Sequence, residues 1–263
     1  FMARMVALAG STAAAEALIG SIAASPAAAA VIPPSDPRLR TGIVHPYPRY
    51  NAYAAAPRTQ RRKLPGVLVI HENRGLNDHI RDVTRRVALA GYFAVAPDFL
   101  SPVGGTPANE DQAREMIGKL DLNAAVSAAV SMLGSLKRRT GGNGKAGAVG
   151  FCWGGAFVNR LAVAAGKQLD AGVAYYGPAP APSEAAKVDA PLLLHFAGLD
   201  TRVNATGFPW AEALRKAGKQ VEAFTYDGVN HAFNNDTSAE RYNKDAADLA
   251  WQRTLAFFAR HLR

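Results

Sequence analysis

The sequence has only one cysteine, Cys152, among its 263 residues. One cysteine excludes an intramolecular disulfide framework and any zinc site built from several cysteines. Charged residues are also few, at 19% of the chain, and the net charge is +9. A basic balance can indicate binding to nucleic acid or to a membrane surface. Here the basic residues are scattered in short groups without interleaved aromatic residues, so we expect a solvated basic surface and no nucleic-acid partner.

The start of the chain lacks an uninterrupted apolar run of membrane-spanning length, because Glu16 interrupts the alanine-rich stretch over residues 6–30. Residues 28–30 would satisfy an A-x-A cleavage site, and Phe1-Met2 would match the end of an Arg-Arg-x-Phe-Met twin-arginine signal. We expect residues 1–40 to be a signal-like and linker segment that exports the protein to the periplasm, without stable membrane insertion. The alternatives are a cytoplasmic protein and an N-terminal helix packed on the domain.

Strand and helix patterns alternate over residues 41–263, and we found no internal repeats. The run over residues 66–70 is apolar throughout, which is typical of a strand buried on both faces. The alternation predicts an α/β fold with three layers, a mostly parallel sheet with helices on both faces, in one catalytic domain. The expected strands are 41–46, 50–55, 66–70, 92–96, 145–149, 171–175, 191–196 and 221–226. The expected helices are 77–90, 109–136, 154–165, 205–217 and 239–262.

Cys152 lies in the segment Gly150-Phe151-Cys152-Trp153-Gly154-Gly155, between an expected strand and an expected helix. The G-x-C-x-G pattern is that of a nucleophile elbow, with cysteine where serine is commoner. Small residues are needed on both sides because the sharp turn brings neighbouring backbones together. A single cysteine can also be a small buried hydrophobic residue, so partners elsewhere in the chain must decide between the two interpretations.

Two partners follow later expected strands, Asp200 after residues 191–196 and His231 after residues 221–226. Functional groups of parallel sheets collect at the carboxyl ends of the strands. The order nucleophile, acid, histidine is that of α/β-hydrolases. A histidine can accept the thiol proton, and a carboxylate can orient the ring and stabilise the imidazolium. We therefore predict that Cys152, Asp200 and His231 act together, with Asp98 as the second choice for the carboxylate.

A further carboxylate, Glu72, directly follows the strand over residues 66–70 and reaches the same edge of the sheet. It could hold or deprotonate the thiol. The backbone N–H groups of Asn73 and Trp153 are the expected oxyanion hole. His71, His79 and His195 show no H-x-x-x-H spacing, so we expect no metal and no cofactor.

Several segments together resemble the dienelactone hydrolase (carboxymethylenebutenolidase) family, over about residues 40–263. These segments are the cysteine elbow, His71–Gly75, Tyr92–Asp98, Tyr175–Gly177 and Asn230–Phe233. The resemblance implies an α/β-hydrolase fold without cofactor and a Cys152-Asp200-His231 triad. It also implies a glutamate, matching Glu72, that contacts the resting thiol and helps to form the thiolate. The implied reaction is attack on an ester or lactone, an acyl-enzyme thioester, and hydrolysis.

The chain departs from the family where arginines hold the substrate carboxylate. Residues 99–103 contain no arginine, and Asn235 stands where the family has another. Arg74 and Arg202 are candidates to replace them. Tyr176 and Phe233, in segments that carry the resemblance, are further candidates for substrate contact.

The sequence therefore predicts a carboxylic ester or lactone hydrolase acting on a small molecule. A thioesterase or general aryl esterase with the same site is the first alternative, and a non-catalytic binding protein on a hydrolase scaffold is the second. We expect a monomer or homodimer.

Overall fold

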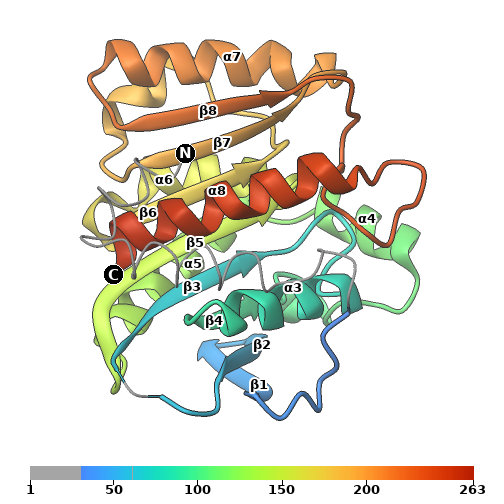
Figure 1. Cartoon of the computed structure of the whole chain (residues 1–263), viewed down its shortest axis with the longest axis vertical. Helices are drawn as coiled ribbons and strands as arrows, with labels where there is room; N and C mark the ends of the chain where they lie inside the picture. The colour runs from blue at the N-terminus through green and yellow to red at the C-terminus, as the bar shows by residue number, and fades with distance from the viewer. Residues whose placement is uncertain (1–30, 61) are drawn as a thin grey trace.

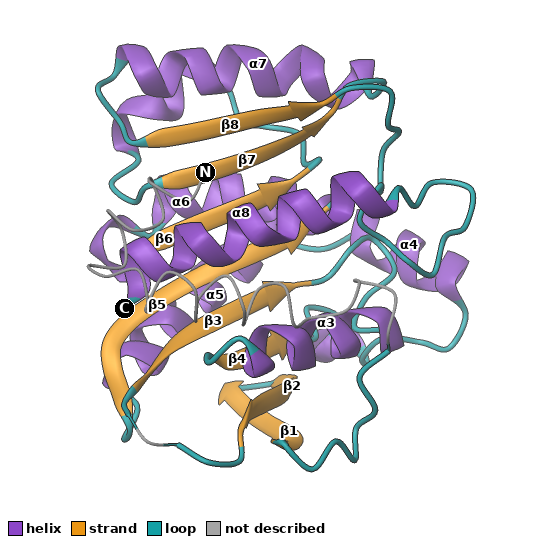
Figure 2. Ribbon diagram, in the orientation of Figure 1, coloured by secondary structure: helices purple, strands orange, loops and turns teal. Residues whose placement is uncertain are grey.

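A single eight-stranded sheet runs through the protein, as the computed structural model shows (Figures 1 and 2). The structure describes residues 31–60 and 62–263. The strands lie in the order β1-β2-β4-β3-β5-β6-β7-β8. Strands β3 to β8 are mutually parallel, and β1 and β2 add an antiparallel hairpin beside β4. The strands are β1 (Leu39–Tyr47), β2 (Tyr50–Pro57), β3 (Leu64–Ile70), β4 (Phe93–Pro97), β5 (Gly142–Phe151), β6 (Ala171–Tyr175), β7 (Leu192–Ala197) and β8 (Val221–Tyr226).

Helices cover both faces of this sheet. The α-helices are α3 (Asp78–Leu89), α4 (Glu110–Gly118), α5 (Leu122–Arg138), α6 (Trp153–Ala164), α7 (Thr201–Lys216) and α8 (Lys244–Leu262). Short 3-10 helices occupy Ser101–Val103, Gly166–Gln168 and Pro182–Lys187. Helices α5, α6 and α7 pack into one hydrophobic cluster, and α3 and α8 into the other. Three layers and a mostly parallel sheet were predicted, and the structure confirms both.

The central strand β3 shows why the sheet is buried on both faces. All seven of its residues are buried. Leu68 and Ile70 contribute to the cluster under α5, α6 and α7, whereas Val67 and Val69 contribute to the cluster under α3 and α8. Successive strand side chains point to opposite faces, so an uninterrupted apolar run is what a two-sided core requires.

The prediction of one helix over residues 109–136 is wrong. The segment forms α4 and α5, whose axes differ in direction by 97°. The break has a local cause, because the Asp121 side chain accepts a hydrogen bond from the Ala124 N–H at 3.0 Å and caps a new helix. Helix α4 is capped in the same way by Asn109, whose side chain accepts from the Gln112 N–H at 3.0 Å.

Two other helices begin at residues that differ from the prediction. Helix α7 begins at Thr201 instead of residue 205, because Asp200 caps the Val203 N–H. Helix α8 begins at Lys244 instead of residue 239, where Asn243 is the cap. A capping side chain sets both helix starts, and the spacing of apolar residues does not indicate where such a cap lies.

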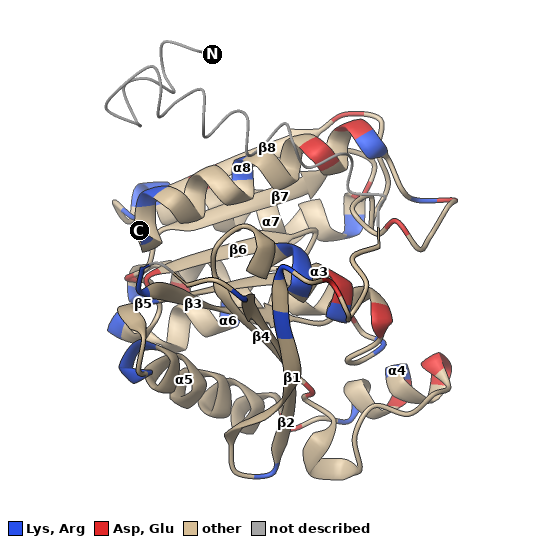
Figure 3. Ribbon diagram, turned by 60° about the horizontal axis from the view of Figure 1, so that its bottom comes forward, with Lys and Arg blue, Asp and Glu red and all other residues tan. Residues whose placement is uncertain are grey.

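The predicted signal-like segment lies outside the described residues, except for its final part. There, Ile32 binds helix α3: its N–H donates to Asp82 at 2.6 Å and its carbonyl accepts from Arg85. None of the described helices is long and apolar enough to cross a membrane alone, and α4 with α5 meets that test only as a sharply bent pair. Lys and Arg residues are spread over several elements, including α3, α5 and α8 (Figure 3).

Candidate active site

Cys152 occupies a strained turn between β5 and α6. Its φ and ψ are 55° and −114°, a conformation that residues with a Cβ atom rarely adopt. A Cβ added at Gly150 would lie 2.1 Å from the Gly154 carbonyl oxygen, and one added at Gly154 would lie 2.4 Å from the Ile70 carbonyl oxygen. The glycines are therefore required by close backbone approach, as expected for a nucleophile elbow.

His231 and Asp200 lie in line with the Cys152 thiol. The sulfur is 3.1 Å from Nε2 of His231, and Nδ1 of His231 is 2.5 Å from Oδ2 of Asp200. A carboxylate only accepts, so Nδ1 donates its proton to Asp200 and Nε2 is left to accept from the thiol. The other oxygen of Asp200 caps α7 through the Val203 N–H. These two contacts hold the carboxylate and, through it, the histidine ring.

The surroundings of Cys152 favour its neutral form. Burial and, next, the Glu72 carboxylate raise the pKa of the thiol from 9.0 to about 11. The Trp153 N–H and the Arg202 guanidinium act in the opposite direction, and Asp200 adds a smaller upward contribution to the pKa. At neutral pH the resting group is therefore a thiol hydrogen-bonded to His231, and not a thiolate.

Glu72 is buried beside this thiol and is held by Asn235. Oε2 of Glu72 accepts from Nδ2 of Asn235 at 2.9 Å. Oδ1 of Asn235 accepts from both the N–H and the hydroxyl of Thr237, which fixes the direction of the amide. Oε1 of Glu72 is buried without a hydrogen-bond partner among the described residues. The Cys152 sulfur is hydrogen-bonded to His231. Within the described part of the chain, no hydrogen bond joins this sulfur to Glu72.

The two predicted oxyanion-hole residues lie in the loop after β3 (Asn73) and at the start of α6 (Trp153). Trp153 is the first residue of α6, where backbone N–H groups have no acceptor within the helix. Its indole ring stacks on the His71 ring, with centroids 5.2 Å apart and planes at 11°. His71 in turn donates from Nδ1 to the Glu72 carbonyl oxygen at 2.7 Å and accepts at Nε2 from the Phe99 N–H at 3.3 Å. His71 thus connects the Asn73 loop to the elbow, a role that the sequence did not reveal.

The other histidines and Asp98 have structural partners. His195 contacts the Tyr226 hydroxyl and the Thr254 hydroxyl, and burial lowers its pKa to about 3. Asp98, the second choice for the carboxylate, accepts hydrogen bonds from the N–H groups of Leu100 and Thr106 and from the Thr106 hydroxyl, so it stabilises a turn. Among residues 31–60 and 62–263, no group of three or more His, Cys, Asp or Glu side chains could hold a metal ion.

The four candidates for substrate contact have different surroundings. Arg74 forms an ion pair with Glu110 at the start of α4. Tyr176 and Phe233 are fully buried, and the Tyr176 ring packs edge-on against His231 at 5.0 Å and against Phe233 at 5.3 Å. They support the histidine from inside the core. Arg202 alone of the four lines an open pocket beside His231.

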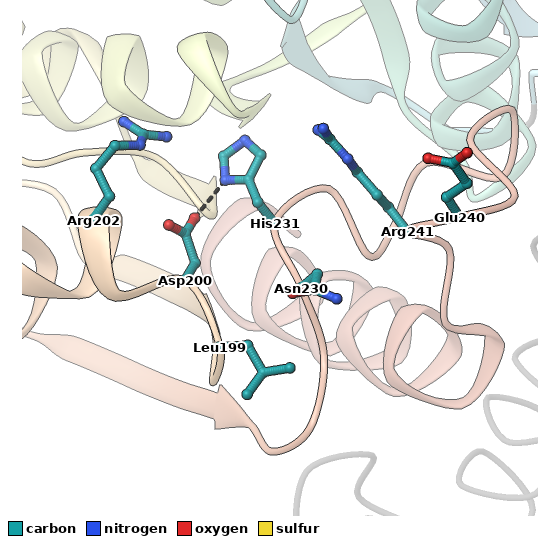
Figure 4. Close-up of a pocket in the computed structure, with 7 residues that line it drawn as sticks. All are labelled: Leu199, Asp200, Arg202, Asn230, His231, Glu240 and Arg241. Atoms are coloured by element: carbon teal, nitrogen blue, oxygen red, sulfur yellow. Dashed lines mark hydrogen bonds and ion pairs between the residues drawn. The ribbon is translucent and has the colours of Figure 1, made fainter.

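That pocket has a volume of about 450 Å³, and His231 and Asp200 form part of its lining (Figure 4). Figure 4 shows the guanidinium groups of Arg202 and Arg241 on either side of the His231 ring. Arg241 was not predicted as a site residue: it falls within the helix expected over residues 239–262, but the structure places it in the loop that precedes α8. The lining residues are Leu199, Asp200, Arg202, Asn230, His231, Glu240 and Arg241.

Comparison with known proteins gives consistent results. The sequence model of the "Dienelactone hydrolase family" matches residues 50–262. A Salmonella typhi protein named "Putative carboxymethylenebutenolidase" is 32% identical over 256 residues, covering 91% of this chain and 94% of its own length. The crystal structure of a "Putative Dienelactone Hydrolase" from Klebsiella pneumoniae superposes with a TM-score of 0.76 at 30% identity, covering 84% of this chain and 98% of that one. An acylaminoacyl peptidase of Pyrococcus horikoshii shares the fold, with a TM-score of 0.61 at 16% identity over 85% of this chain and 42% of that one.

Proposed function

This chain belongs to the dienelactone hydrolase family, and from that membership we propose that Cys152 attacks the carbonyl carbon of an ester or lactone. The chain is a hydrolase of ester or lactone bonds. The observation that carries the proposal is the continuous line of hydrogen bonds from Asp200 through His231 to a thiol on a strained elbow. Nucleophile, base and orienting group stand within direct reach of one another.

In the first half of the reaction, Nε2 of His231 takes the thiol proton as sulfur bonds to the carbonyl carbon. The carbonyl oxygen becomes an oxyanion that faces the N–H groups of Trp153 and Asn73. The carbon–oxygen bond to the alcohol then breaks, and His231 returns its proton to the departing oxygen. The products are an alcohol and a thioester on Cys152. In a lactone the alcohol stays attached to the acyl group.

In the second half, water attacks the thioester and His231 takes a proton from it. The thiolate leaves and regains that proton, which releases a carboxylic acid and restores the resting enzyme. Asp200 stabilises the imidazolium in both halves. The atoms balance as ester plus water giving acid plus alcohol.

Glu72 makes the resting site unfavourable for a thiolate. Its charge raises the pKa of Cys152, and a thiolate with a high pKa is a stronger nucleophile than one with a low pKa. Attack moves negative charge from sulfur, beside Glu72, to an oxygen that faces two N–H donors. The same carboxylate that opposes the free thiolate therefore favours its transfer to substrate.

The proposal is tested by hydrolysis of 4-nitrophenyl acetate by wild-type protein and by Cys152→Ala. We expect wild-type turnover and a loss of about 10⁴-fold or more in kcat/KM in the variant, because the nucleophile is removed while the oxyanion hole remains. Turnover by Cys152→Ala at the wild-type rate would contradict the assignment.

A further inference from the structure

The turn after β3, residues 71–76, carries one of the two oxyanion donors, the N–H of Asn73, so this inference rests on the proposed function. That N–H donates no hydrogen bond to another group in the part of the chain that the structure describes. An oxyanion donor acts through its position, because a misplacement of about 1 Å can cost on the order of 100-fold in rate. The contacts that fix this turn therefore determine how well the donor works.

The loop that follows β4 holds this turn at both of its ends. At the start of the turn, the Phe99 N–H donates to Nε2 of His71 at 3.3 Å. At its end, the Leu76 N–H donates to Oγ1 of Thr106 at 2.9 Å. The turn also lies directly against this hydroxyl, since a Cβ added at Gly75 would be 2.3 Å from Oγ1 of Thr106. The Thr106 hydroxyl thus fixes where the turn ends.

Asp98 folds the loop after β4 so that Thr106 faces the turn. Its Oδ1 accepts from the Thr106 hydroxyl at 2.8 Å and from the Leu100 N–H at 3.0 Å, and its Oδ2 accepts from the Thr106 N–H at 2.9 Å. Asp98 is buried, and its own N–H donates to the Asn51 carbonyl oxygen in β2 at 2.8 Å. A hydroxyl has one proton, so donation to Asp98 leaves the Thr106 oxygen to accept from Leu76.

These contacts form a continuous connection from the sheet to the oxyanion donor. We propose that Asp98 and Thr106 are positioning residues that hold the Asn73 N–H where the oxyanion forms. Glu72 belongs to the same turn, but its carboxylate is held separately by Asn235. Loss of the Thr106 hydroxyl should therefore weaken the stabilisation of the oxyanion and leave the reactivity of the thiol unchanged.

The test compares Thr106→Val, which lacks the hydroxyl, with Thr106→Ser, which keeps it. For 4-nitrophenyl acetate, we expect kcat and kcat/KM to fall together by at least about tenfold in Thr106→Val, because the lost interaction exists only in the transition state. Thr106→Ser should stay within about threefold of wild type, because it offers the same donor and acceptor. Alkylation of Cys152 by iodoacetamide should not change in either variant, because it displaces iodide and forms no oxyanion.

Thr206→Val is the matched control. The Thr206 hydroxyl also accepts from a backbone N–H, that of Ala179 at 3.1 Å, and donates to a backbone carbonyl, that of Val203 at 3.1 Å. This variant should hydrolyse the ester at the wild-type rate. Asp98→Asn should lower kcat/KM as Thr106→Val does, and the double variant should lose less than the product of the two single losses, because both residues act through the same bond.

A mimic of the transition state measures the donor itself. The Cys152 sulfur adds to the carbonyl carbon of trifluoroacetone, the thiol proton passes to His231, and the former carbonyl oxygen becomes an oxyanion. The inhibition constant of trifluoroacetone should rise in Thr106→Val by the same factor by which kcat/KM falls.

The outcomes separate this proposal from the proposed function. Hydrolysis by Thr106→Val at the wild-type rate, an equal loss in Thr206→Val, an unchanged inhibition constant, or alkylation that falls in step with hydrolysis would each overturn the positioning role. Cys152-dependent hydrolysis by wild-type protein would still stand in all four cases. Absence of Cys152-dependent hydrolysis by wild-type protein would overturn both.

Discussion

Among the individual residues, Cys152 has the most consequential environment. It is at once strained, buried and placed near a carboxylate that disfavours its charge. Its single strong partner is His231, at 3.1 Å. A thiol in this setting is held neutral until a neighbouring base and an electrophile act on it together.

This environment predicts the pH dependence of alkylation. Because the pKa of Cys152 is raised to about 11, its thiolate fraction should rise about tenfold per pH unit between pH 7 and 10. The rate of modification by iodoacetamide should rise in parallel. Intact-mass spectrometry reports it without ambiguity, since the chain has no other cysteine. A rate that is level between pH 7 and 9 would mean that the thiolate is already formed.

Glu72→Gln provides the control for that experiment. Removing the carboxylate charge should lower the pKa of Cys152, because Glu72 is the second-largest cause that raises it. Alkylation at pH 8 should then be faster than in wild-type protein. An unchanged alkylation rate would remove the electrostatic role assigned to Glu72.

The sequence was sufficient to predict the site residues that follow the ends of strands. It was not sufficient to predict residues whose role is to hold another side chain of the site. Cys152, Asp200 and His231 each follow a recognisable strand, so the sheet topology brings them together. The bond between Asn235 and Glu72 joins positions 163 residues apart in the chain. No local pattern encodes such a pairing. The stacking of His71 on Trp153 is hidden for the same reason.

Between elements, the backbones of the elbow and of the end of β3 approach each other closely. Gly154 in α6 and Gly118 in α4 are both helical, and alanine is intrinsically favoured over glycine in a helix by about 0.5–1 kcal/mol. A Cβ at Gly154 would lie 2.4 Å from the Ile70 carbonyl oxygen, whereas a Cβ at Gly118 would meet no atom within 4 Å. Gly118→Ala is therefore a suitable control for Gly154→Ala.

We expect Gly154→Ala to reduce the free energy of unfolding by about 1–3 kcal/mol, because backbone atoms must shift to admit the methyl group. Gly118→Ala should leave it unchanged or raise it slightly. Urea denaturation midpoints of the two variants provide the comparison. Equal midpoints would show that the elbow tolerates the displacement.

A buried ionic cluster fastens the loop that follows His231 to helix α3. Asp236 binds Arg86 at 2.6 Å and His79 at 3.3 Å, and Arg86 also binds Asp82 at 2.5 Å. Burial alone would raise the pKa of Asp236, but its hydrogen bonds to His79 and Arg86 outweigh this and lower the pKa below 3.8. Asp236 therefore stabilises the fold fully above pH 3.8, and that contribution is lost as the pH falls through the lowered pKa.

Asp236→Asn should lower the free energy of unfolding at pH 7 by about 1.5–3 kcal/mol, because Arg86 loses one carboxylate partner and keeps another, Asp82. The difference from wild type should shrink as the pH falls below 3.8, where this aspartate is protonated in the unfolded chain, toward the lowered pKa of Asp236 in the folded protein. Urea titrations at pH 7 and pH 3.5 measure both quantities. The control is Asp78→Asn, an exposed carboxylate 4.0 Å from Arg81. An effect of Asp236→Asn no larger than the control's would refute the anchoring role.

Most strands and helices were predictable from the sequence, and the three largest errors, all at helix starts, have one cause. Apolar runs located the strands, and the helix predicted over residues 77–90 matches α3, which ends at Leu89 shortly before Gly91 with its φ of 93°. The failures at residues 109–136, 201 and 244 are all helix starts set by a capping side chain, namely Asp121, Asp200 and Asn243. Caps depend on one hydrogen bond, whereas periodicity averages over several turns.

For the whole molecule, one sheet brings together residues that are distant in sequence. The carboxyl ends of β3, β5 and β7 and the loop after β8 supply Glu72, Cys152, Asp200 and His231. The pocket beside His231 is lined by two arginines, Arg202 and Arg241, and by two acidic residues, Asp200 and Glu240. The family determines the reaction class, hydrolysis of ester or lactone bonds.

The central claim is that hydrolysis passes through a thioester on Cys152. The most direct measurement is intact-mass and peptide-mass spectrometry of protein mixed with 4-nitrophenyl acetate and quenched in acid within milliseconds. We predict one acetyl group, located on Cys152 and removed by neutral hydroxylamine. An acetyl group on any other residue during turnover would contradict the account.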